Sequence, residues 1–101
     1  MRRQVILIPQ ALLDASDAYE WYEQQDLGLG EEFLRCLEAA YAKISDSPEQ
    51  YPIRFDSFRR ILIRRFPYAV YFEHDDQHIW IHYIFHCSQD PARLRERLGK
   101  T

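Results

Sequence analysis

Four side chains in the second half of the chain have the types needed to cleave a phosphodiester without a metal ion. Such a reaction requires a general base, a general acid and cations that stabilise the charge of the transition state. His86 is the natural acid or base, because imidazole titrates near neutral pH. Arg59 and Arg65 are candidates for holding the phosphate, and Tyr83 can contribute a hydroxyl group. Together they define a candidate ribonuclease site.

This candidate site depends on a strand that places both arginines on one face. Residues 58–66 are rich in β-branched and aromatic types with arginines interleaved, which predicts a strand. Arg59 and Arg65 are an even number of positions apart, so they would share a face, with Arg60 and Arg64 on the other. The alternative is structural: His86 bonds to nearby backbone, and the arginines pair with carboxylates.

The histidines also invite a metal hypothesis, because His74, His78, His82 and His86 fall at every fourth position. On a helix, that spacing would place them on one face. The last three lie in a predicted strand over residues 78–87, where neighbours are roughly 13 Å apart. Ligands of one ion lie roughly 4 Å apart. We therefore expect no metal site and no cofactor.

The composition is that of one folded domain over residues 1–101, with 47% hydrophobic and 15% aromatic residues. Two cysteines cannot support a disulfide scaffold, and no apolar run approaches the roughly 20 residues of a membrane helix. The start MRRQVILIPQ has no small-residue cleavage site and is not a typical signal peptide. We expect a cytoplasmic protein with free thiols at Cys36 and Cys87 and no membrane association.

The net charge of −3 is unevenly distributed. Residues 1–50 carry four basic and ten acidic side chains, whereas residues 51–101 carry nine basic and six acidic ones. An enzyme that grips ribosomal RNA gains affinity by neutralising phosphates, for which a net negative protein is poorly equipped. Binding to a protein target does not require a positively charged surface, so the net charge favours a protein target over RNA.

Two amphipathic helices are predicted in the first half, after a short strand over residues 5–8. Apolar residues recur with helical spacing over 9–24 and again over 30–45, and the glycine-containing segment 26–30 separates the two runs. Two consecutive helices with a short connection form an antiparallel hairpin. Each helix has one apolar stripe, so the pair must cover another layer.

That layer is a sheet predicted from the second half. Strands are expected over 58–66, 68–74 and 78–87, joined as an antiparallel meander, with a final helix over 90–99. The order β-α-α-β-β-β-α is typical of an α+β fold in which the helical hairpin packs on a twisted, mostly antiparallel sheet. Aromatic residues at both parities of the last strands indicate that the second sheet face is also partly covered.

At this point the chain resembles the RelE/ParE toxin superfamily of type II toxin–antitoxin systems, most closely its ParE-like, plasmid-stabilisation branch. The matches run in order through nearly the whole chain: Trp21-Tyr22-Glu23, Leu29-Gly30-Glu31-Glu32-Phe33, Ile44, Pro48, Tyr51-Pro52, Arg59, Phe66-Pro67-Tyr68-Ala69-Val70-Tyr71-Phe72, Ile79, Ile81, His86, Asp90-Pro91 and Arg97. Two departures stand out. Ser88 and Gln89 replace arginines that the branch commonly carries, and Leu94 replaces a common tryptophan.

The resemblance implies a small growth-inhibiting toxin that a cognate antitoxin neutralises in a hetero-oligomeric complex. ParE-like members are associated with DNA gyrase, which is the target we favour. The alternatives are a RelE-like, ribosome-dependent mRNA endoribonuclease, and a degenerate member that binds an antitoxin without being toxic. Family members are similar in binding an extended antitoxin segment. Aromatic residues of the helical hairpin are the candidate anchors for it, or else core residues: Tyr19, Trp21, Tyr22 and Tyr41.

Overall fold

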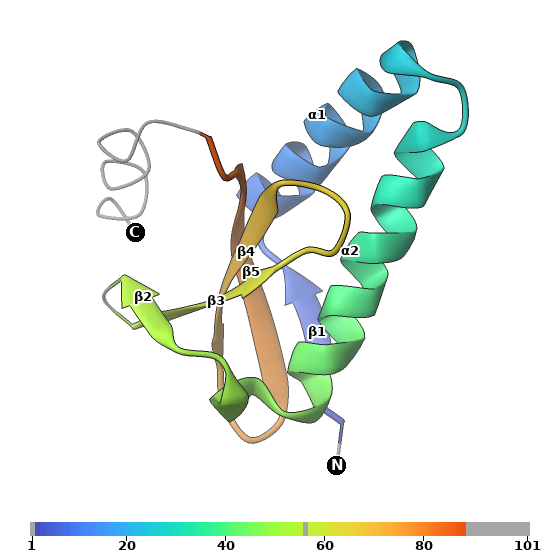
Figure 1. The fold of residues 1–101 in the computed structure, drawn as a ribbon. Coiled ribbons are helices and arrows are strands. Elements are labelled where there is room, and N and C mark those ends of the chain that lie inside the picture. Colours follow the sequence, from blue (N-terminus) through green and yellow to red (C-terminus); the bar gives the residue numbers. More distant parts are fainter. Residues whose placement is uncertain (1, 56, 89–101) are drawn as a thin grey trace.

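The computed structural model describes residues 2–55 and 57–88, and the helix predicted over 90–99 lies outside them. Eight elements follow in order: β1 (Gln4–Leu7), α1 (Pro9–Gln25), α2 (Leu29–Asp46), the 3-10 helix η1 (Pro48–Gln50), β2 (Ile53–Phe55), β3 (Phe58–Leu62), β4 (Tyr68–His74) and β5 (His78–His86). Figure 1 shows the helical hairpin beside the sheet. No helix of this described part is long and apolar enough to span a membrane.

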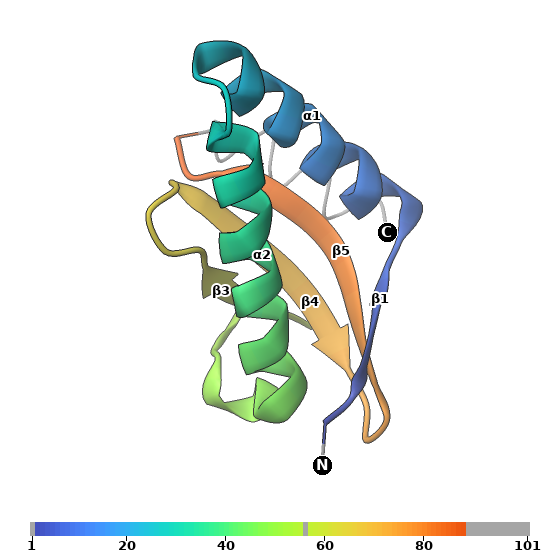
Figure 2. The same ribbon diagram turned by 90° about the vertical axis from the view of Figure 1, so that its right-hand side faces the viewer.

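The five strands form one sheet in the order β1-β5-β4-β3-β2, and both helices cover the same face of it (Figure 2). The pairs β5–β4, β4–β3 and β3–β2 are antiparallel, whereas β1 pairs with β5 in parallel. A parallel pair cannot be joined by a tight turn. Here the helical hairpin carries the chain from β1 at one edge of the sheet towards β2 at the other edge, and the antiparallel strands return to β5. The α+β prediction of a hairpin on a mostly antiparallel sheet is therefore confirmed.

Two details of the predicted sheet are wrong. The C-terminal half contributes four strands to the sheet instead of three, because β2 pairs with β3 at the edge. This three-residue strand follows Pro52 and is too short to show an alternating pattern. In addition, β3 ends at Leu62, four residues before the predicted end. The chain then turns, with Arg65 at a φ of 71° and the Ile63 amide donating to the Tyr68 carbonyl.

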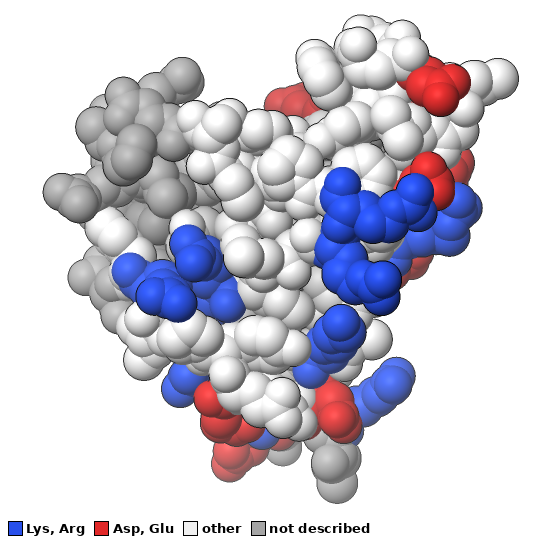
Figure 3. Space-filling model, in the orientation of Figure 1, with Lys and Arg blue, Asp and Glu red and all other residues white. Residues whose placement is uncertain are grey.

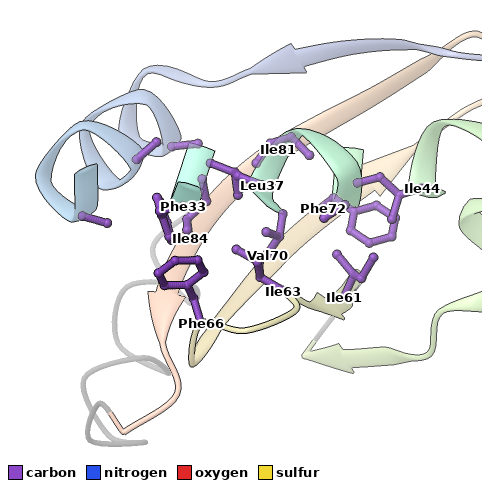
Figure 4. Close-up of a cluster of buried hydrophobic side chains, with 14 of the residues drawn as sticks. Phe33, Leu37, Ile44, Ile61, Ile63, Phe66, Val70, Phe72, Ile81 and Ile84 are labelled. Atoms are coloured by element: carbon purple, nitrogen blue, oxygen red, sulfur yellow. The ribbon is translucent and has the colours of Figure 1, made fainter. Parts of the chain in front are cut away.

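The core lies between the hairpin and the sheet (Figure 4). The predicted stripes of both helices are buried there, against side chains of β4 and β5: Ala11, Ala15, Ala18 and Tyr22 of α1, and Phe33, Leu37, Ala40 and Ile44 of α2. Alanines dominate the α1 stripe, so its backbone approaches the sheet closely. Phe33 and Phe72 are fully buried, which contributes roughly 1.5–3 kcal/mol for each ring.

The connection between the helices is held by the carboxylate of Glu23. It accepts hydrogen bonds from the backbone amides of Gly28, at 3.0 Å, and Gly30, at 2.9 Å. These amides lie at the start of α2, where N–H groups have no partner within the helix, and Gly28 has no side chain to supply one. A carboxylate from α1 therefore caps α2. Gly28 itself has a φ of 91°, which favours glycine.

We predict that Gly30→Ala lowers the free energy of unfolding by about 1–3 kcal/mol. A Cβ at this position would lie 2.8 Å from the Tyr19 carbonyl oxygen and 2.9 Å from Glu23 Oε1, so α1 and α2 would have to separate. Urea denaturation followed by circular dichroism measures the change. Ala39→Ser, at an exposed position of the same helix, is the control and should differ little from wild type. Equal stability of Gly30→Ala and wild type would contradict the close helix contact.

Candidate partner-binding site

The structure does not bring the four candidate ribonuclease side chains together. Arg59 lies opposite Phe72 in the β3–β4 ladder, and its guanidinium donates a hydrogen bond of 2.6 Å to the Tyr51 carbonyl. His86 lies opposite Tyr68, at the other end of β4. Phe72 and Tyr68 are four positions apart on the strand, which is roughly 13 Å. Arg59 and His86 therefore lie at opposite ends of the sheet.

Arg65 does not share a strand face with Arg59, contrary to prediction, because β3 ends at Leu62. Its guanidinium instead forms an ion pair of 2.8 Å with Glu32 in the first turn of α2. The pair joins the β3–β4 turn to the helix. Since the Arg65 side chain is 60% exposed, the pair contributes little to stability.

Tyr83 and His86 project from opposite faces of β5. Tyr83 is buried with Tyr71 and Phe85 in a second cluster, on the sheet face away from the helices. His86 Nδ1 accepts a hydrogen bond of 3.1 Å from the backbone amide of Ser88, and it lies 2.7 Å from the hydroxyl oxygen of the same residue. These contacts match the structural alternative for His86, which bonds close to the end of its own strand.

A groove lies between α2 and β3, and we call it the α2–β3 groove. Two adjoining hollows of about 300 Å³ each compose it, and both are lined by Lys43, Ile61 and Leu62. Its floor and walls include small and apolar side chains of α2, such as Ala39 and Ala40. Leu62 is 57% exposed, which leaves apolar surface open in the groove.

The rim of the α2–β3 groove is strongly basic. Figure 3 shows lysine and arginine side chains gathered along the flank where α2 meets the end of β3. One acidic residue, Glu32, lines the two hollows, and Arg65 already pairs with it. The basic residues that line them are Arg35, Lys43, Arg54, Arg60, Arg64 and Arg65. An apolar floor with a cationic rim is complementary to an acidic, amphipathic peptide segment.

The four candidate aromatic anchors have different environments. Trp21 is 55% exposed, while Tyr22 is buried against Phe33 and Phe66 as a core residue. The Tyr19 hydroxyl donates to Glu31 of α2 at 3.1 Å, and this contact raises the pKa of Tyr19. The Tyr41 hydroxyl is buried without a hydrogen-bond partner in the described part of the chain, and burial raises its pKa. Trp21 therefore offers the most accessible ring of the four.

His82 is held on the face away from the helices, in an arrangement that sequence reasoning missed. Its Nε2 lies 3.0 Å from Glu73 Oε1, and the other oxygen of Glu73 accepts a hydrogen bond from the Ser57 hydroxyl. The ring also packs edge-on against Phe58. Burial lowers the pKa of His82, although the Glu73 carboxylate acts in the opposite direction. Alternation with Ile81, which faces the helices, places His82 on this face, but its partner Glu73 comes from another strand and no local pattern predicts the pair.

We predict that the lowered pKa of His82 makes stability sensitive to acid. The unfolded chain binds the imidazole proton more readily than the folded chain, so this contribution to stability is present above about pH 6.5 and lost as the pH falls below it. His82→Gln should reduce the decline of the urea midpoint between roughly pH 7 and 5. His74→Gln serves as the control, and identical profiles for wild type and His82→Gln would contradict the prediction.

The helical hairpin on a sheet of this order defines an α+β fold of the RelE/ParE kind. A solved structure described as "Chromosomal ParDE TA system from P. aeruginosa" has this fold, with a TM-score of 0.73 and 15% sequence identity, over 84% of this chain and 96% of that chain. A family model described as "ParE toxin of type II toxin-antitoxin system, parDE" matches residues 5–91. The chain therefore belongs to the ParE toxin family. No curated protein matches it.

Proposed function

We propose that this toxin arrests growth by acting on a protein target, with DNA gyrase as the first candidate. This proposal is supported by the positions of the four candidate ribonuclease residues, which lie far from one another: Arg59, Arg65, Tyr83 and His86. Cleavage of RNA without a metal requires acid, base and cation around one phosphate. The contacts of these four side chains hold them at separate places, on two faces and at two ends of the sheet.

A cognate antitoxin neutralises the toxin by docking an acidic, amphipathic segment in the α2–β3 groove, so that the two proteins form a hetero-oligomer. The basic rim supports an acidic partner, and the exposed part of Leu62 supports an apolar contact beneath it. Trp21, Tyr19 and Tyr41 are further anchor candidates along the hairpin. Tyr22, the fourth candidate, is a core residue whose ring packs edge-on against Trp21.

The second candidate function is a ribosome-dependent mRNA endoribonuclease. One observation favours it, because the cationic rim of the groove also attracts phosphate. The apolar lining favours a peptide instead, since a nucleic-acid backbone gains nothing from Ile61, Ala39 and Leu62. A degenerate, non-toxic member is the third candidate, supported by Ser88 and Gln89 in place of the arginines of the branch.

We predict that His86→Ala retains full growth arrest upon induced expression, because the imidazole bonds to Ser88 and lies away from the other three residues. Colony counts measure arrest, primer extension on abundant messages detects cleavage, and a reporter of the DNA-damage response detects gyrase poisoning. Arrest with intact mRNA and an induced damage response supports gyrase. Cleaved mRNA that disappears with His86→Ala supports the ribonuclease, and unaffected growth with wild type supports the degenerate member.

We predict that the double variant Arg35→Glu/Arg64→Glu weakens antitoxin binding by about 10- to 100-fold, because it reverses two charges of the groove rim. Both side chains are exposed, so folding should be preserved. The measurement is calorimetric titration with the product of the neighbouring reading frame, after its co-expression has been shown to restore growth. Arg2→Glu is the matched control, since Arg2 is exposed and does not line the groove. Equal affinities for the double variant and wild type would remove the groove from the proposal.

A further inference from the structure

A separate pocket of about 290 Å³ lies on the other side of the hairpin, between α1 and the ends of β4 and β5. We call it the α1–β5 pocket. Two carboxylates and several aromatic rings line it, contributed by Asp14, Asp17 and Trp21 of α1, Tyr68 of β4 and His86 of β5. None of the described residues that line it is a lysine or an arginine. It is thus the electrostatic opposite of the α2–β3 groove.

The sheet topology explains why a carboxylate stands at this position. β1 pairs with β5 only from Gln4 to Leu7, so among the described residues no strand lies beside the later part of β5 on that side. Asp14 takes the place of the missing strand, because its Oδ2 accepts a hydrogen bond of 3.0 Å from the Ile84 amide. Gln10 donates to the other oxygen at 3.0 Å. The Asp14 carboxylate is therefore fixed at the pocket wall.

The negative charge of Asp14 affects the pKa of Tyr68, which lies across the pocket. The pKa of Tyr68 is raised by burial first, and then by the nearby Tyr22 hydroxyl and the Asp14 carboxylate. Tyr68 also supports the His86 ring, with 5.1 Å between the ring centroids in an edge-on contact. The inner wall is thus aromatic and lies beside a fixed negative charge.

The outer wall combines a second carboxylate with an indole. Asp17 and Trp21 are one helical turn apart on the same face of α1, and both line the pocket. Asp17 is exposed, and Trp21 is 55% exposed while its ring packs edge-on against Tyr22 at 5.1 Å. A carboxylate beside an aromatic ring favours binding of a guanidinium group. The guanidinium donates hydrogen bonds to the carboxylate and stacks on the ring.

We propose that the α1–β5 pocket binds an arginine side chain presented by a protein partner. The guanidinium would stack on the Trp21 ring, and its N–H groups would donate to the carboxylates of Asp17 and Asp14. A metal ion is a poorer occupant, because the described residues hold no group of three histidine, cysteine or acidic side chains with ligand geometry. The inference does not depend on the target or on the antitoxin proposed above.

The test uses the ¹⁵N-labelled full chain and N-acetyl-arginine methylamide as the probe. The chain has two tryptophans, so each indole N–H gives a separate NMR signal. Trp80 is the internal reference, because it stacks on His78, away from the pocket. We expect the Trp21 signal to shift saturably with arginine while the Trp80 signal stays in place. The citrulline analogue, which has the same shape without the charge, should leave both signals unchanged.

Asp17→Asn should weaken binding of the arginine probe about threefold to fivefold, the effect of one exposed charge pair. Glu20→Gln is the matched control, since Glu20 is an exposed carboxylate of α1 that does not line the pocket. Its affinity should equal that of wild type. The proposal is overturned if the Trp21 signal does not move, if citrulline moves it equally, or if Trp80 moves in parallel. Equal affinities for Asp17→Asn and wild type would also overturn it.

Discussion

The parallel pairing of β1 with β5 is the constraint on which the rest of this structure depends. Two parallel neighbours cannot be joined by a tight turn, so the chain between them must cross one face of the sheet. Here the crossover is the α1–α2 hairpin together with the following strands, and its apolar stripes bury that face. The hairpin therefore leads from β1 at one edge of the sheet towards β2 at the other edge, and it also covers one face of the sheet.

Close packing at the hairpin turn limits how the two helices can move. Glu23 caps the start of α2 from α1, and the Gly30 backbone lies so close to Tyr19 that a Cβ does not fit. The polar contact of Tyr19 with Glu31 joins the same two turns. Because these contacts set the angle of α2 over the sheet, they also set the width of the α2–β3 groove.

The hairpin separates charges of opposite sign. α2 contributes Arg35 and Lys43 to a basic groove beside β3, whereas α1 contributes Asp14 and Asp17 to an acidic, aromatic pocket beside β5. The net charge of −3 does not reveal this separation of basic and acidic surfaces. The separation arises because α1 and α2 lie over different parts of the same sheet face. A surface of this kind favours partners by their charge pattern.

The sequence by itself determined the parts of this protein that depend on neighbouring residues. The stripe Phe33, Leu37 and Ile44 predicted α2, and the segment 68–74 predicted β4 with the observed bounds, because periodicity and β-branching act locally. Only the tertiary structure decided that Arg65 leaves β3 for Glu32 and that Asp14 bonds to Ile84. Each of these contacts joins residues far apart in the chain, so the packing of a helix against the sheet decides them and no local pattern predicts them.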